Sequence, residues 1–119
     1  MRKILILADE PLILKYLTLS LSNEYQVFPF STAIEAKYFF ELGNTADYIL
    51  CDYMLGSING IDFLNIIIDK KYLNNIQKNF IFITAFNENE IFNKLLSTGC
   101  RIIDKCELTP LKVKEHFEK

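Results

Sequence analysis

Five polar side chains with complementary chemistry are spread along this 119-residue chain, and most follow a short apolar run. They are three carboxylates, one hydroxyl and one amine: Asp9, Glu10, Asp52, Thr84 and Lys105. Three carboxylates brought together repel one another unless a cation lies among them. Ligands that are all oxygen favour a hard ion, and Mg²⁺ suits a partly open acidic site because it keeps several waters. The set therefore predicts a magnesium site if the chain brings these residues together.

The same set is typical of phosphoryl transfer. That chemistry requires a metal and a cation on the oxygens of the transferred group, with a nucleophile in line. A carboxylate can be that nucleophile and form an acyl phosphate. Asp52 is the central candidate for the nucleophile, Lys105 for the cation, and Thr84 for the hydroxyl that hydrogen-bonds the bound group.

Short apolar runs that alternate with segments of helical period predict the elements that must position these residues. Strands are expected over residues 4–8, 26–30, 48–52, 80–84 and 101–104. Helices are expected over residues 11–23, 32–43, 61–72 and 88–98, with a last one opening at Thr109-Pro110. This alternation predicts an α/β fold, a parallel sheet with five helices on its two faces. In such sheets ligands bind outside the carboxyl ends of the strands, where all five polar side chains are expected.

Length, charge and cysteine content limit the classes of function. A chain of 119 residues fits one domain, and 15 acids against 13 bases give a net charge of -2. No basic excess exists for nucleic acid, so direct DNA binding is not expected. The first apolar run is too short for a signal peptide or a membrane span. Three cysteines without metal-ligand spacing favour a reduced, cytoplasmic compartment.

The ordered motifs resemble the two-component response regulator receiver domain (the CheY-like superfamily). The resemblance covers the whole chain and is carried by the following residues: Asp9-Glu10, Asp52, Gly60, Thr84-Ala85, Gly99 and Lys105. It implies a flavodoxin-like receiver fold with strand order 2-1-3-4-5. It also implies one receiver domain over residues 1–119, either alone or as the N-terminal part of a longer regulator.

The resemblance assigns roles to the site. It implies that Asp52 is the phosphoacceptor and that Mg²⁺ is held by Glu10, Asp52 and the Met54 carbonyl, with Asp9 acting largely through water. Thr84 would be the switch hydroxyl, and Lys105 would pair with Asp52 and then with the phosphoryl group. The implied partners are a histidine kinase or phosphotransfer protein and a downstream effector or fused output domain.

Three positions depart from the family pattern. Cys106 replaces the proline that commonly follows the lysine in a cis peptide, Ile102 replaces an aromatic switch residue, and Gly56 replaces a loop proline. The segment from Gly99 to Lys105 also looks one residue shorter. A cis bond before a non-proline residue costs about 3 kcal/mol. We therefore predict a trans Lys105–Cys106 bond with the lysine ammonium still close to Asp52.

Apolar residues on the predicted helix 88–98 indicate a contact surface. Two adjacent pairs, Ile91-Phe92 and Leu95-Leu96, are more than one helix face is expected to bury. Part of this stripe must be core, and we assign Ile91, Leu95 and Leu96 to a contact surface on the condition that at least one of them stays partly exposed. Together with the fifth strand and the last helix they would form the partner or homodimer surface, with Thr84 and Ile102 as switch residues.

Other functions remain open on the sequence. Ile102 and Cys106 favour a non-phosphorylated pseudo-receiver that acts as an interaction module, whereas the intact acids, Thr84 and Lys105 argue against it. A haloacid dehalogenase-type phosphatase would need an acid where Met54 stands. A flavin carrier would need a phosphate-binding loop where Asp9-Glu10 would repel phosphate. Finally, Asp9-Glu10 before Pro11 could simply cap a helix.

Overall fold

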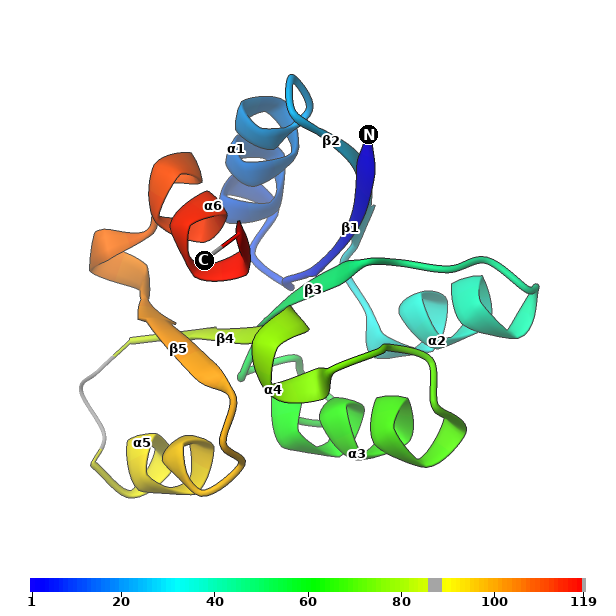
Figure 1. Ribbon diagram of the computed structural model, residues 1–119. Coiled ribbons are helices and arrows are strands. Elements are labelled where there is room, and N and C mark those ends of the chain that lie inside the picture. Colours follow the sequence, from blue (N-terminus) through cyan, green and yellow to red (C-terminus); the bar gives the residue numbers. More distant parts are fainter. Residues whose placement is uncertain (86–88, 119) are drawn as a thin grey trace.

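The computed structural model describes residues 1–85 and 89–118 and contains one five-stranded parallel sheet in the order β2-β1-β3-β4-β5 (Figure 1). The strands are β1 (Arg2–Leu7), β2 (Tyr25–Phe30), β3 (Tyr48–Asp52), β4 (Phe80–Thr84) and β5 (Arg101–Asp104). The order and all five strands are as predicted, and the bounds of β3, β4 and β5 agree to the residue.

Helices cover both faces of the sheet, with α1 and α6 on one face and α2, α3 and α5 on the other (Figure 1). The helices are α1 (Pro11–Leu21), α2 (Ala33–Glu41), α3 (Gly60–Lys70), α4 (Ile76–Asn79), α5 (Asn89–Leu96) and α6 (Pro110–Glu118), with a 3₁₀ turn η1 (Lys105–Glu107). The five predicted helices are present, and α4 and η1 are additional single turns. The predicted start of α5 at Glu88 lies outside the described residues.

Side-chain caps fix where several helices begin. The Glu35 amide donates to the Thr32 hydroxyl at α2, and the Lys112 amide donates to Thr109 at α6, as the sequence predicts. A third cap was not predicted: at α3 the Asp62 amide donates to Asn59, and the Asn59 amide donates back to the Asp62 carboxylate. This reciprocal pair holds the loop that leads from β3 into α3.

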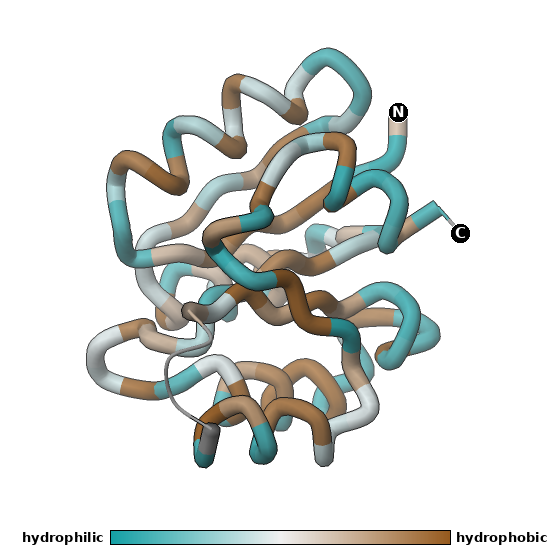
Figure 2. The backbone as a smooth tube through the Cα atoms, turned by 90° about the vertical axis from the view of Figure 1, so that its left-hand side faces the viewer, coloured by the Kyte–Doolittle hydropathy of each residue, from teal (hydrophilic) through white to brown (hydrophobic). Residues whose placement is uncertain are grey.

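Alternate residues of the strands enter two separate cores, one on each face. Strands β3 and β4 are buried along their whole length, as expected for the centre of a parallel sheet. Figure 2 shows hydrophobic backbone segments running through the middle of the molecule. Within residues 1–85 and 89–118 no helix is long and apolar enough to span a bilayer.

The orientation of α5 corrects one prediction. Leu95 was assigned to the partner surface, but its side chain is fully buried in the core beside α3. Ile91, one turn earlier, is partly buried against the same core, and so is Ile102. Leu96, turned about 100° further round the helix, is 53% exposed. Only Ile91 and Leu96 of the three predicted surface residues therefore reach solvent.

Candidate functional site

The topology gathers the five predicted residues at the carboxyl edge of the sheet. Asp9 and Glu10 follow β1, Asp52 ends the adjacent β3, and Thr84 ends β4. Lys105 comes directly after β5. Asp52 lies opposite Ile83 in the strand register, so Thr84 is one residue beyond this pair.

The three acids form a compact cluster. One carboxylate oxygen from each of Asp9, Glu10 and Asp52 lies within 4.8 Å of the other two. Asp52 is only 1% exposed, whereas Asp9 and Glu10 are open to solvent. The Glu10 side chain makes no capping hydrogen bond to α1, so helix capping by this side chain does not explain the acid.

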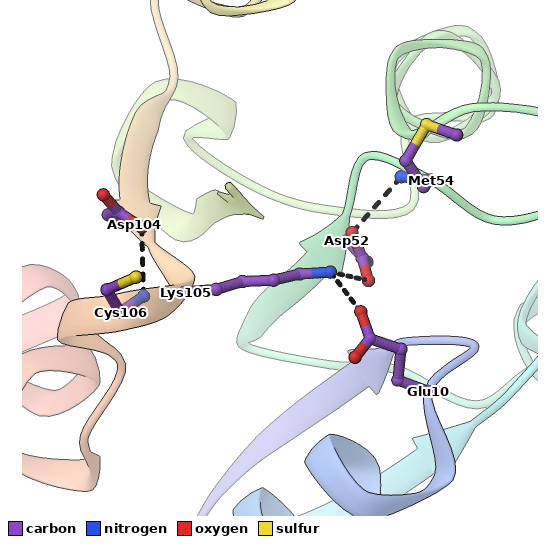
Figure 3. A network of polar contacts seen from close by, with 6 residues as sticks. All are labelled: Glu10, Asp52, Met54, Asp104, Lys105 and Cys106. Atoms are coloured by element: carbon purple, nitrogen blue, oxygen red, sulfur yellow. Dashed lines mark hydrogen bonds and ion pairs between the residues drawn. The ribbon is translucent and has the colours of Figure 1, made fainter. Parts of the chain in front are cut away.

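Lys105 connects two of these acids. Its Nζ lies 2.5 Å from Glu10 Oε1 and 3.0 Å from Asp52 Oδ2 (Figure 3). The contact with Asp52 is an ion pair to the buried Oδ2, which has no other partner among the described residues. The other oxygen, Oδ1, accepts a hydrogen bond from the Met54 amide at 3.2 Å. Asp52 is thus held at one oxygen by the Met54 amide and at the other by Lys105.

The charges in the cluster do not balance, because one ammonium faces three carboxylates. Burial raises the pKa of Asp52, and the Asp9 charge adds to the rise, although Lys105 and the Met54 amide lower the pKa in part. Burial lowers the pKa of Lys105, but the hydrogen bond and charge of Glu10 and the contact with Asp52 raise it overall. An oxygen-only cluster that carries more negative than positive charge fits Mg²⁺, which suits such ligands. The residues present are therefore compatible with the predicted metal.

Both parts of the prediction about Lys105 and Cys106 are confirmed. The peptide bond between them is trans, and the ammonium still reaches Asp52. The sequence did not predict how the chain achieves this. Residues 105–107 form η1, and the Cys106 amide donates to Asp104 Oδ1 at 3.0 Å. A proline at position 106 would have no N–H to donate.

The remaining site residues line the same edge. Thr84 is buried, and Met54 is 60% exposed in the loop after β3. A cleft of about 450 Å³ runs beside the acids from Asp9 along this loop and includes Met54 and Asn59. The cleft gives access to the cluster from solvent. Asn59 was missed by sequence reasoning, although its spacing from Asp62 is a capping signal.

Gly60 is required by close backbone packing beneath Asp52. A Cβ atom at this position would lie 2.7 Å from the Asp52 carbonyl oxygen and 3.1 Å from the Phe82 ring. The Gly60 amide also donates to the Tyr53 carbonyl at 2.7 Å. Position 60 therefore fixes the end of β3, where Asp52 stands.

We expect Gly60→Ala to lower the free energy of unfolding by about 1–3 kcal/mol, the usual cost of overpacking. Alanine in a helix would otherwise be favoured over glycine by roughly 0.5–1 kcal/mol, so the sign of the effect is diagnostic. Urea unfolding measures it, with Ser57→Ala in the exposed part of the same loop as control. A Gly60→Ala protein as stable as the unsubstituted chain would contradict the packing argument.

Comparison with known proteins identifies the family. The model of the response regulator receiver domain matches residues 4–108. A search of curated proteins gave no match.

Solved receiver domains share the fold. The response regulator receiver domain protein from Clostridium thermocellum gives a TM-score of 0.82 at 21% identity, covering 99% of this chain and 92% of that chain. The receiver domain of the Francisella response regulator 1452 gives 0.79 at 20% identity, covering 99% and 98%. The receiver domain of a signal transduction histidine kinase from Syntrophus aciditrophicus gives 0.80 at 21% identity, covering 99% and 88%. Because the family model covers most of the sequence, the chain belongs to the response regulator receiver domain family and is a signalling domain.

Proposed function

We propose that this chain is a phosphoacceptor switch that takes a phosphoryl group onto Asp52 from a histidine kinase or a phosphotransfer protein. The observation that carries the proposal is the Asp52 carboxylate itself. It is buried at the end of β3, in contact with Lys105, and within 4.8 Å of two further acids. A purely structural site would not need three carboxylates around one lysine, because like charges at this distance are destabilising.

The residues of the chain have separate roles in the transfer. The Met54 amide holds Oδ1 of Asp52, whereas Oδ2 is paired with Lys105 and would be the attacking oxygen as the lysine moves to the phosphoryl group. As the new O–P bond forms, the P–N bond to the donor histidine breaks, and its electron pair stays on the imidazole nitrogen. The Lys105 ammonium leaves the carboxylates and pairs with a phosphoryl oxygen, whose charge it neutralises.

The metal requirement follows from the same cluster. Asp9, Glu10, Asp52 and the Met54 carbonyl would hold Mg²⁺, which supplies positive charge to the phosphoryl oxygens when bound. Glu10 is paired with Lys105 in this structure, so Glu10 would hold the metal only after this pair had opened.

We propose that the surface beside β5 contacts the downstream partner. Once Asp52 carries the group, Thr84 at the end of β4 would hydrogen-bond it, and Ile102 on the adjacent strand would respond. Ile91 and Leu96 on α5 would then form the contact for an effector, a fused output domain or a second copy. The proposal also includes a cytoplasmic location and a receiver domain that either stands alone or is the N-terminal part of a longer regulator.

Intact-mass spectrometry after incubation with acetyl phosphate tests the function. We expect one added phosphoryl group when Mg²⁺ is present and none in excess chelator. Asp52→Asn, which keeps the shape of the side chain without its charge, is expected to stay unmodified. Absence of labelling under every condition would favour the alternative, a pseudo-receiver that binds partners without phosphorylation.

Met54 is expected to prolong the phosphorylated state. It stands at the mouth of the site, is largely exposed, and cannot orient an attacking water because its side chain is apolar. We expect Met54→Asn to speed loss of the phosphoryl group by about threefold to tenfold. This is less than the roughly 100-fold or more by which a well-positioned acid or base accelerates a reaction, because asparagine would only orient the water.

The decay of the phosphorylated protein, followed by mass after donor removal, measures this effect. Leu111→Asn makes the same kind of change at an exposed apolar residue of α6, away from the site. An unchanged or slower decay in Met54→Asn would refute the role. By the resemblance to the receiver family, Phe86, two residues after Thr84, would flank the group from the other side, but it lies outside the described residues.

A further inference from the structure

Two hydrogen bonds made by residues next to Lys105 hold the backbone of the loop that carries it. Asp104 ends β5 in an extended conformation, and its Oδ1 accepts the Cys106 N–H at 3.0 Å. The 3₁₀ turn η1 follows, and the Leu108 amide donates to the Lys105 carbonyl at its end. An Asx turn of this kind sets the backbone direction at the residue it encloses, which here is Lys105.

Asp104 is an acid at the same edge of the sheet as the cluster, yet it lies outside it. In the strand register it stands opposite Thr84. Its oxygens are not among the mutually close carboxylates of Asp9, Glu10 and Asp52. Figure 3 shows the Asp104 carboxylate turned to the Cys106 amide, while the Lys105 side chain extends the other way, toward Asp52 and Glu10. Asp104 is therefore engaged with the backbone of the turn and is not part of the acid cluster.

We propose that Asp104 is a positioning residue, whose hydrogen bond with the Cys106 amide aims Lys105 at Asp52. The role depends on Cys106 having an N–H, so acid and amide work as a pair. The inference deepens the proposed function and rests on it for the purpose of the lysine. The geometric part, that Asp104 controls the contact between Lys105 and Asp52, can be tested without any phosphoryl donor.

The first test is a double-mutant cycle on folding. Urea unfolding is measured for Asp52→Asn, for Lys105→Met and for the double variant. The four unfolding constants, including that of the unsubstituted chain, give the coupling between the two side chains. We expect a coupling of at least about tenfold in the unfolding constant, within the range for residues in direct contact. In an Asp104→Ala background the coupling should fall below about threefold. Unfolding curves also show that each variant folds, and no metal is needed.

Two matched variants separate the hydrogen bond from the charge. Asp104→Asn keeps a side-chain oxygen that can accept the Cys106 N–H, so it should preserve the coupling. Glu107→Ala removes a negative charge from the same turn. The Glu107 carboxylate has an exposed contact of 3.8 Å with Lys112, which contributes little, so this variant should also preserve the coupling. Full coupling in Asp104→Ala, or equal loss in Asp104→Asn and Asp104→Ala, would overturn the proposal.

The second test is the rate of phosphorylation by acetyl phosphate with Mg²⁺ for the same three variants. We expect Asp104→Ala to be roughly threefold to tenfold slower, in line with the loss of a capping hydrogen bond. Asp104→Asn and Glu107→Ala should match the unsubstituted protein. If no protein is phosphorylated, the proposed function fails, while the cycle still decides the role of Asp104. Normal phosphorylation of Asp104→Ala would contradict that role alone.

Discussion

Lys105→Met is expected to slow phosphorylation of Asp52 by about 100-fold. Removing one preorganised positive donor from a site of developing negative charge typically costs this much in rate. Lys105 is the only cation in contact with Asp52 among the described residues, at 3.0 Å, so no neighbour can replace it. The initial rate with acetyl phosphate and Mg²⁺, followed by intact mass, measures the loss.

Lys112→Met is the matched control, because Lys112 is an exposed base on α6 whose 3.8 Å contact with Glu107 contributes little. Its rate should equal that of the unsubstituted chain. Circular dichroism should show that both variants are folded. A Lys105→Met protein phosphorylated as fast as the control would exclude a catalytic role for the lysine.

Leu95→Asp is expected to remove about 4 kcal/mol or more from the free energy of unfolding. The substitution deletes a fully buried apolar side chain, worth about 2–5 kcal/mol by itself, and buries a carboxylate without a partner. Such a loss is a large part of the roughly 5–15 kcal/mol that stabilises a domain. Urea unfolding monitored by circular dichroism measures it.

Leu96→Asp provides an adjacent control with the same chemical change. Leu96 is 53% exposed, so its substitution should alter stability by no more than about 0.5 kcal/mol. Leu96→Asp, rather than Leu95→Asp, is therefore the variant that can test α5 as a partner surface. Equal stability of the two variants would contradict the orientation of α5.

The fold and the convergence of the acids could be predicted because both depend on simple patterns. Nearly continuous apolar runs predicted β3 and β4 correctly, since central strands of a parallel sheet are buried on both faces. The edge at which Asp52 meets Asp9 and Glu10 follows from parallel strands, whose carboxyl ends share one side. Neither inference requires knowledge of side-chain conformations.

The rest depends on features that a periodic pattern does not contain. The turns α4 and η1 are too short to show a helical period. Leu95 and Leu96 have the same residue type, and only the rotation of α5 against the core separates them. The contact of Lys105 with Glu10 depends on the reach of two long side chains. The use of Asp104 as a cap depends on which of several acids the Cys106 amide meets.

Asp52, rather than either neighbouring acid, is proposed to carry the phosphoryl group. Borohydride reduces an acyl phosphate to an alcohol, so a phosphorylated aspartate becomes homoserine, which peptide mass spectrometry can locate. After treatment with acetyl phosphate and Mg²⁺, we expect homoserine at position 52, and none there when Mg²⁺ is chelated. Reduction product at position 9 or 10 with position 52 unmodified, or no product at all three, would contradict it.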